Sequence, residues 1–202
     1  MRRNFSLALS LFFCIVIFTG CDSGPKITPL SSGTVILAFG DSLTHGTGAA
    51  DGLSYPEILA GLIGHEVINE GIPGEVSATG LKRLPGLLKE YNPTLVILCH
   101  GGNDFLRRMN QDRTTANLKA MVALIKSHGA DVVLVGVPKF GFGSTVPEFY
   151  AQIAEEQEIP YEGEILVELL SDSSMKSDAI HPNATGYRLM AEAIKQVIEQ
   201  AQ

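Results

Sequence analysis

Short runs of apolar residues alternate with longer amphipathic stretches from residue 34 onward. The runs are rich in Val, Ile and Leu, a composition typical of strands that are buried on both faces of a sheet. Strands that alternate with helical patterns indicate an α/β domain with a parallel sheet and crossover helices. The runs predict strands at residues 34–39, 66–69, 94–99 and 132–137, and a weaker strand near residues 160–161.

Three helices are predicted from caps and from apolar residues at three- and four-residue spacing. The first begins after Ser54, which forms a capping box with Glu57, and it ends near Gly64. The second covers residues 114–128 and stops before a glycine. The third runs from about residue 183 to residue 199.

A polar, Gly-rich cluster follows each of the first four predicted strands. Ligands of open parallel sheets bind outside the carboxyl ends of the strands, so these clusters mark the edge at which function is expected. The clusters are Gly40-Asp41-Ser42, NEGIPGE at residues 69–75, HGGND at residues 100–104, and PKFGFG at residues 138–143.

The first residues follow a different pattern. Arg2 and Arg3 precede a nearly continuous apolar segment at residues 5–18. This segment is shorter than the roughly 20 apolar residues that a spanning helix needs. We interpret residues 1–20 as a signal peptide that directs the domain out of the cytoplasm.

The end of this signal, FTGC, resembles a bacterial lipobox, and the resemblance implies that Cys21 is lipidated. A periplasmic or cell-envelope lipoprotein of a bacterium, anchored in a membrane by its lipid, is therefore expected. A plain cleaved signal and an uncleaved anchor are the alternatives. Residues 22–33 are rich in Ser, Pro and Gly and predict a flexible tether to a domain at residues 34–202.

Composition and charge narrow the class further. A chain of 202 residues with 45% hydrophobic and 18% charged residues is typical of one globular domain. The net charge of -7 leaves no basic patch for a phosphate backbone, which argues against a nucleic-acid partner. A monomer is the default expectation. Once Cys14 and Cys21 are assigned to the signal and the lipid, Cys99 is alone, so no intramolecular disulfide is expected.

Ser42 could turn the backbone or react, and reaction requires a base that takes its proton. His65 and His128 lie at helix ends, where a cationic side chain is ordinary capping. His181 differs because Asp178 precedes it by three residues in a polar loop, so the acid could orient the imidazole. A turn in which Asp178 serves only as a cap is the alternative.

Acyl transfer also needs donors that face the developing oxyanion. Gly71 and Gly74 could offer backbone amides, and Asn103 a side-chain amide, which Gly101 and Gly102 allow to face the site. Each is ordinary in a turn. Together, on one sheet edge with a serine and a histidine, they supply the parts of a serine hydrolase.

The segments FGDSLT, NEGIPGE, GGND and DAIHPN, in this order, resemble the four sequence blocks of the SGNH hydrolases, also called GDSL esterases. The resemblance covers essentially residues 34–200. It implies a three-layer α/β/α sandwich around a five-stranded parallel sheet of flavodoxin-like type. The branch of small periplasmic enzymes described as thioesterase, lysophospholipase and arylesterase is the most similar one.

The resemblance assigns roles to individual residues. It implies Ser42 as the nucleophile, His181 as the general base and Asp178 as the residue that orients this base. It implies an oxyanion hole made of the Ser42 amide, the Gly74 amide and the Asn103 side chain. The implied activity is hydrolysis of small carboxylic esters or thioesters with short-to-medium acyl groups through an acyl-enzyme. Neither a cofactor nor a metal is expected.

A carbohydrate O-deacetylase of the same family is the main alternative, and a non-catalytic lipid-anchored binding module is a remote one. The histidines lack the H-E-x-x-H spacing of zinc hydrolases, and no phosphate-binding loop is present. No G-x-S-x-G nucleophile elbow is present either, which argues against the commoner α/β-hydrolase scaffold.

The substrate pocket is the least determined part. Apolar residues after the third and fourth strands could form a wall for an acyl chain or belong to the core, and the glycines after the fourth strand favour a mobile loop at residues 138–146. The candidate pocket residues are Phe105, Leu106, Phe140 and Phe142.

Four further polar residues border the candidate site. His45 is expected in its wall, and His100 is expected to pack at the strand end or behind the site. Asp41 and Asp104 are expected to brace their turns through hydrogen bonds to the backbone.

Overall fold

The structure, a computed structural model, describes residues 24–141 and 145–202. The expected signal peptide, Cys21 and Phe142 therefore lie outside the described residues, as do Gly143 and the centre of the loop at residues 138–146.

A five-stranded sheet with the order β2-β1-β3-β4-β5 forms the centre of the fold, and every pair of neighbouring strands is parallel. The predicted α/β fold and all five predicted strands are confirmed, with bounds that differ by two residues or fewer. The strands are β1 (Val35–Gly40), β2 (Glu66–Gly71), β3 (Leu95–Cys99), β4 (Asp131–Val135) and β5 (Tyr161–Glu162).

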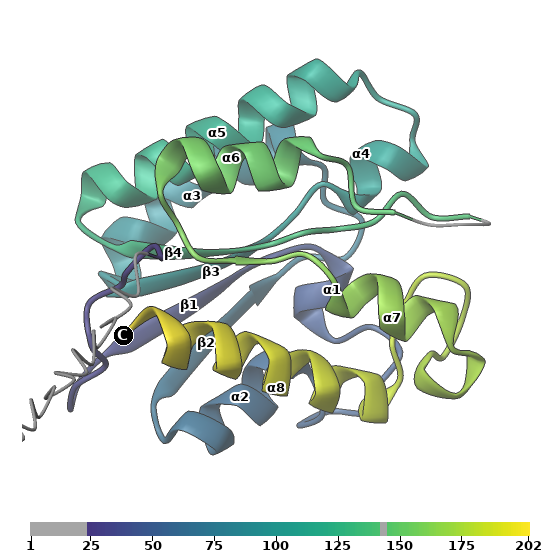
Figure 1. The fold of residues 1–202 in the computed structure, drawn as a ribbon, viewed down its shortest axis with the longest axis horizontal. Coiled ribbons are helices and arrows are strands. Elements are labelled where there is room, and N and C mark those ends of the chain that lie inside the picture. Colours follow the sequence, from purple (N-terminus) through teal and green to yellow (C-terminus); the bar gives the residue numbers. More distant parts are fainter. Residues whose placement is uncertain (1–23, 142–144) are drawn as a thin grey trace, which may run out of the picture.

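Helices cover both faces of this sheet and complete the three-layer sandwich (Figure 1). One layer contains α3 (Ser77–Tyr91), α5 (Gln111–His128) and α6 (Phe149–Gln157), and the other contains α2 (Tyr55–Ile63), α7 (Ile165–Ser171) and α8 (Ala184–Ala201). Three short elements connect the layers to the strand ends: α1 (Ser42–His45), α4 (Gly102–Leu106) and the 3₁₀ turn Ser173–Met175.

The three predicted helices correspond to α2, α5 and α8. The capping box of Ser54 and Glu57 is present at the start of α2. Helix α5 begins three residues before the predicted start because the side chain of Asn110 caps it, and it ends at Gly129 as predicted. The side chain of Asn183 caps α8 by accepting a hydrogen bond from the Gly186 N–H at 3.1 Å.

Helices α3, α6 and α7 were not predicted, and α3 shows why. It contains Pro85, which removes a backbone donor and ordinarily ends a helix. The proline is exposed, whereas Gly80, Leu84 and Leu88 are buried at four-residue spacing on one face. Packing of that face against the sheet and α5 therefore outweighs the local preference.

The part of the expected tether that the structure describes makes contacts with the domain. The Ile27 side chain is buried, and its N–H donates to the Ala201 carbonyl at 3.0 Å. The N–H of Thr28 donates to the Asp131 carboxylate at 2.6 Å. The segment around residue 27 thus packs beside the end of α8.

Two glycines allow an unusually close approach at the edge where β1 and β2 end. A Cβ atom on Gly40 would lie 2.2 Å from the Cys99 carbonyl oxygen, and one on Gly71 would lie 2.1 Å from the His45 nitrogen. Helix α1 therefore rests directly on the strand ends. This contact places the residue after Asp41 at the edge predicted to carry the function.

Candidate active site

Ser42 is the first residue of α1, immediately after the central strand β1. The carboxylate of Asp41 caps this short helix by accepting the N–H of Leu43 at 3.1 Å. A left-handed Gly46 ends the helix after a single turn. The geometry explains why the strand stops at this polar cluster: the turn leaves the Ser42 side chain partly exposed at the sheet edge.

Ser42 lies in a chain of three side chains linked by hydrogen bonds. Its hydroxyl Oγ is 2.9 Å from His181 Nε2, although the two residues are 139 positions apart. The other ring nitrogen, Nδ1, is 2.8 Å from Asp178 Oδ2. An ionised carboxylate can only accept, so the proton resides on Nδ1, and the lone pair of Nε2 is left for the hydroxyl. This is the tautomer in which a histidine can act as a base towards serine.

Local hydrogen bonds hold the Asp178 carboxylate. Its Oδ1 accepts the N–H groups of Ile180 and His181, each at 2.8 Å. Burial opposes ionisation of this carboxyl, but these bonds and the one from the imidazole outweigh it and hold the pKa of Asp178 below its usual value. Asp178 is therefore ionised at neutral pH, and the exposure of 53% of its side chain favours the same state.

Asn103 faces the serine from α4, the short helix after β3. Its Nδ2 donates to Asp41 Oδ2 at 3.1 Å. Gly101 precedes it with a φ of 111°, and a Cβ there would lie 2.6 Å from the Tyr150 hydroxyl. The predicted role of the glycines before Asn103 thus has a physical basis at Gly101, because a side chain would not fit.

A small cavity of about 10 Å³ lies at the serine. Gly74 is not part of its lining; it has a φ of 79°, and its carbonyl accepts a hydrogen bond from Arg107 at 2.8 Å. The assignment of Gly74 to the oxyanion hole therefore stays a prediction. The lining residues are Asp41, Ser42, Leu43, Gly102, Asn103, Leu106, Phe140, Ile180 and His181.

A network of charged residues beneath the strand ends was missed in the sequence. Arg83 of α3 donates from Nε to both carboxylate oxygens of Glu75, at 2.9 and 3.0 Å. Its Nη2 donates to the carbonyls of Gly40 at 3.2 Å and of Glu70 at 2.7 Å. Its guanidinium carbon also lies 4.2 Å from the centre of the Phe39 ring. Arg83 therefore connects the last residue of β1 with β2.

His100 belongs to the same network. Its Nδ1 accepts the N–H of Gly101 at 2.9 Å, so Nε2 carries the proton and donates to Glu75 at 3.2 Å. The ring is fully buried. Burial disfavours the charge of Glu75, but hydrogen bonds from His100 and Arg83 outweigh it and lower the pKa of this carboxyl. The position of His100 behind the site matches the prediction.

The remaining sequence candidates are structural or peripheral. Asp104 accepts hydrogen bonds from the Ser77 N–H at 2.8 Å and from the Thr114 hydroxyl at 3.1 Å, so its carboxylate joins three helices instead of bracing its own turn as predicted. His45 is exposed and is not part of the lining of the cavity at Ser42, contrary to the expectation that it forms a wall. Within the described residues, no group of three or more His, Cys, Asp or Glu side chains is placed to hold a metal.

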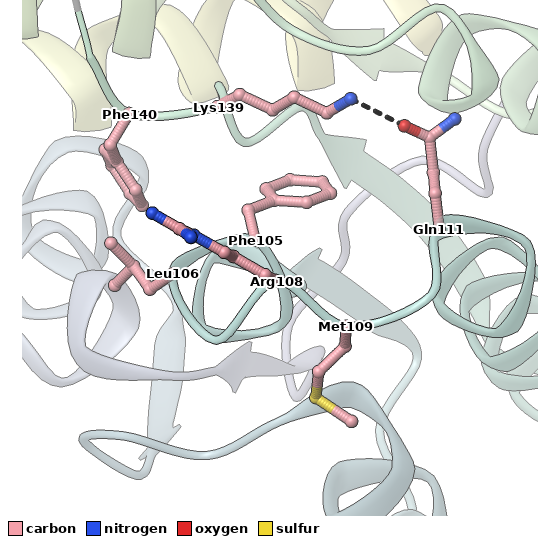
Figure 2. A pocket seen from close by; sticks show the side chains of 7 residues that line it. All are labelled: Phe105, Leu106, Arg108, Met109, Gln111, Lys139 and Phe140. Atoms are coloured by element: carbon pink, nitrogen blue, oxygen red, sulfur yellow. Dashed lines mark hydrogen bonds between the residues drawn. The ribbon is translucent and has the colours of Figure 1, made fainter.

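A second cavity of about 550 Å³ adjoins the first, because Leu106 and Phe140 line both. Three predicted pocket residues, Phe105, Leu106 and Phe140, face it (Figure 2). It is also lined by four residues that were not predicted: Arg108, Met109, Gln111 and Lys139.

Comparisons with known proteins agree with this architecture. The sequence profile of the GDSL-like lipase/acylhydrolase family matches residues 38–189. An arylesterase of Vibrio mimicus is 31% identical, over 94% of this chain and 95% of its own. Thioesterase 1/protease 1/lysophospholipase L1 of Escherichia coli (strain K12) is 29% identical, over 78% and 79%. A crystal structure of TesA superposes with a TM-score of 0.74 at 27% identity and covers 84% of this chain and all of that one.

Proposed function

Since this chain belongs to the GDSL-like lipase/acylhydrolase family and is an ester hydrolase, we propose that Ser42 is the residue that takes up the acyl group. The observation that supports this role is the continuous hydrogen-bonded chain from Ser42 through His181 to Asp178. A serine hydroxyl is a poor nucleophile unless a base removes its proton, and His181 Nε2 is within reach to do so.

The reaction proceeds in two halves that use the same residues. The Ser42 oxygen attacks the carbonyl carbon of the ester or thioester while its proton moves to His181 Nε2. The imidazolium then donates this proton to the departing alcohol or thiol, and an acyl-enzyme remains. Water, deprotonated by His181, attacks the acyl-enzyme and releases the acid and the free serine. Asp178 stays ionised and stabilises the imidazolium throughout.

The oxyanion that forms in each half is stabilised by the Ser42 N–H, the Gly74 N–H and the Asn103 side chain. Asn103 has two amide protons, and only one is used in its hydrogen bond to Asp41. The second is available for the substrate. The hydrogen bond to Asp41 fixes the orientation of the Asn103 amide before the substrate arrives. Burial raises the pKa of the Asp41 carboxyl.

The proposal is tested by following hydrolysis of p-nitrophenyl butyrate and of a butyryl thioester by the purified protein. Wild type should turn over both, and Ser42→Ala should reduce both rates to background. Equal rates for the two proteins would contradict the assignment of Ser42.

We also propose a substrate with a short-to-medium acyl or aryl group. The second cavity supports this because Phe105, Leu106, Met109 and Phe140 give it an apolar lining. The alternative, a carbohydrate O-deacetylase, is separated by an acyl-chain series of p-nitrophenyl esters run beside an acetylated sugar. A sharp preference for acetyl together with turnover of the sugar would overturn our choice.

Export and lipid anchoring through Cys21 remain proposals drawn from the sequence. Within residues 24–141 and 145–202, none of the helices combines the length and the hydropathy of a membrane span. Metabolic labelling with an alkyne fatty acid should mark the wild-type protein in a bacterial host and leave Cys21→Ser unmarked. Equal labelling would remove Cys21 as the site. A monomer also remains the expectation, and size-exclusion chromatography with light scattering checks it.

A further inference from the structure

The second cavity combines an apolar floor with two cationic side chains. Phe105, Met109 and Phe140 supply apolar surface, whereas Arg108 and Lys139 bring positive charge to the same space (Figure 2). Among the described residues, no Asp or Glu is part of this lining. We propose that the cavity binds an anionic group of the substrate, a carboxylate or a phosphate, and that Arg108 is its main partner. The proposal rests on the proposed function of Ser42.

Shared walls connect the cavity to the reacting centre. Leu106 and Phe140 line both the large cavity and the small one at Ser42 and His181. A substrate with its carbonyl at Ser42 can therefore extend past these two side chains. In Figure 2 the guanidinium of Arg108 extends towards Phe140, on the side of the shared wall.

Arg108 occupies a position whose backbone favours glycine. Its φ is 52°, in the left-handed region, and it is one of three such non-glycine residues in the described part of the chain. The Arg108 N–H donates to the Phe105 carbonyl at 2.9 Å, and the next N–H donates to the Asp104 carbonyl at 2.8 Å, which fixes this turn. Strained positions are often found where a side chain serves a ligand. In this conformation the Arg108 side chain lines the second cavity, beside the active site.

The guanidinium of Arg108 has no hydrogen bond or ion pair to any other described residue. Its neighbour Arg107 is used differently, because it donates to the Gly74 carbonyl at 2.8 Å. Arg108 therefore keeps its planar set of donors for a ligand, and this set matches the two oxygens of a carboxylate or a phosphate.

Lys139 adds a second positive charge. Its Nζ donates to Gln111 Oε1 at 2.7 Å and lies 5.8 Å from the centre of the Phe105 ring, which keeps the ammonium over the cavity. An ammonium has three donors, so the contact with Gln111 leaves others for a ligand. In a chain with a net charge of -7, two cations beside an apolar surface favour an anionic substrate over a neutral one.

The anionic group could belong to the acyl part or to the alcohol part of the ester, and two pairs of probes separate these sources. For the acyl side, mono-p-nitrophenyl adipate is compared with p-nitrophenyl hexanoate. For the alcohol side, 1-hexanoylglycerol 3-phosphate is compared with 1-hexanoylglycerol. The kcat/KM ratio of the anionic to the neutral member is measured for each pair at low ionic strength.

Three variants of the full chain are compared with wild type. Arg108→Gln removes the charge, and Arg108→Gly removes the charge together with the backbone strain. Arg113→Gln is the matched control, because this exposed arginine lies in the first turn of α5 and borders a different cavity. Wild type and Arg113→Gln should prefer the anionic member of at least one pair. Both Arg108 variants should lower that ratio about tenfold, the loss expected for one charge-assisted hydrogen bond.

The anion-to-neutral ratio cancels any effect of the substitutions that both members of a pair share, and urea unfolding should show Arg108→Gly at least as stable as wild type. An anion-to-neutral ratio that is the same in wild type and in both Arg108 variants would overturn the proposal. A wild type that discriminates against the anion in both pairs would do so too. If the wild-type protein hydrolysed none of the four esters, the result would instead contradict the proposed function.

Discussion

The two sides of the active site are held in opposite ways. On the nucleophile side, buried groups from distant parts of the chain fix the turn that contains Ser42: Arg83 reaches the Gly40 carbonyl from 43 positions away. On the base side, Asp178 and His181 are three residues apart and are held by hydrogen bonds within their own loop. The hydrogen bond between Ser42 and His181 joins the two sides.

The two sides differ in how far their backbone is buried from water. Gly40, at the end of the central strand β1, has its carbonyl in a buried region, where it requires hydrogen-bond donors. Arg83 and the N–H of Ile72 supply them. The base loop is closer to solvent, where water can satisfy its backbone, and it is closed by an antiparallel bridge between Lys176 and Pro182 and by a hydrogen bond from the Ser177 N–H to the His181 carbonyl. We therefore expect base-side changes to alter the rate alone, and changes beneath the nucleophile to alter stability as well.

Among changes that leave the nucleophile in place, Asp178→Asn should have the largest effect, because it disrupts the base side. Asparagine can keep a hydrogen bond to the imidazole but favours the tautomer with its proton on Nε2, so His181 can no longer accept the serine proton. We expect kcat to fall about 10³- to 10⁴-fold at pH 7. The free energy of unfolding, measured in urea, should change little because the carboxylate is half exposed. An unchanged kcat would show that Asp178 does not orient the base.

Asn103→Ala should have the next largest effect. It removes an oxyanion donor, which typically costs about 10²- to 10³-fold in kcat with little change in KM. The variant also leaves the buried Asp41 without its amide partner, so a modest loss of stability is expected. Steady-state kinetics with p-nitrophenyl butyrate provide the check. A loss confined to KM would indicate that Asn103 binds the ground state and not the oxyanion.

Arg83→Met tests the network beneath the nucleophile. The change leaves Glu75 without its main partner and the Gly40 carbonyl without one donor. We expect a loss of about 2 to 4 kcal/mol in the free energy of unfolding, because an uncompensated charge remains in a mostly buried place. A decrease of about tenfold in kcat should accompany it, since the Ser42 turn loses an anchor. The neighbouring exposed Lys82→Met is the control, and equal stability of both variants would contradict the network's role.

The smallest expected effect is a change in the free energy of unfolding at acid pH. Because the folded-state pKa of Glu75 is lowered, its contribution to stability is fully present above its unfolded-state pKa of about 4.3. This contribution is lost as the pH falls through the lower folded-state value. Glu75→Gln lacks it at every pH. The difference in unfolding free energy between wild type and this variant should therefore shrink from pH 7 towards pH 3, and a constant difference would contradict the assignment.

The same contrast explains how much the sequence could predict. The base side was found because Asp178 and His181 are close in the chain and lie in a polar loop before a helix. The strands, and the edge that gathers Ser42 and Asn103, followed from apolar runs and from the glycines after them.

The network beneath the nucleophile could not be found in this way. Arg83 lies in α3, a helix that Pro85 conceals, and in sequence it resembles an ordinary solvent-facing charge. Its partners, Glu75 and Gly40, meet it only after the sheet and α3 have packed. The pocket shows the same limit: the apolar residues were recognisable in the chain, whereas the left-handed Arg108 is apparent only from the backbone.

We propose that Ser42, activated by His181, forms the acyl-enzyme. The most direct test is to react the protein with a fluorophosphonate and to locate the adduct by intact mass and peptide mapping. We expect one adduct per chain, on Ser42, absent from Ser42→Ala and formed much more slowly by Asp178→Asn. An adduct on another residue, or none while ester hydrolysis continues, would contradict it.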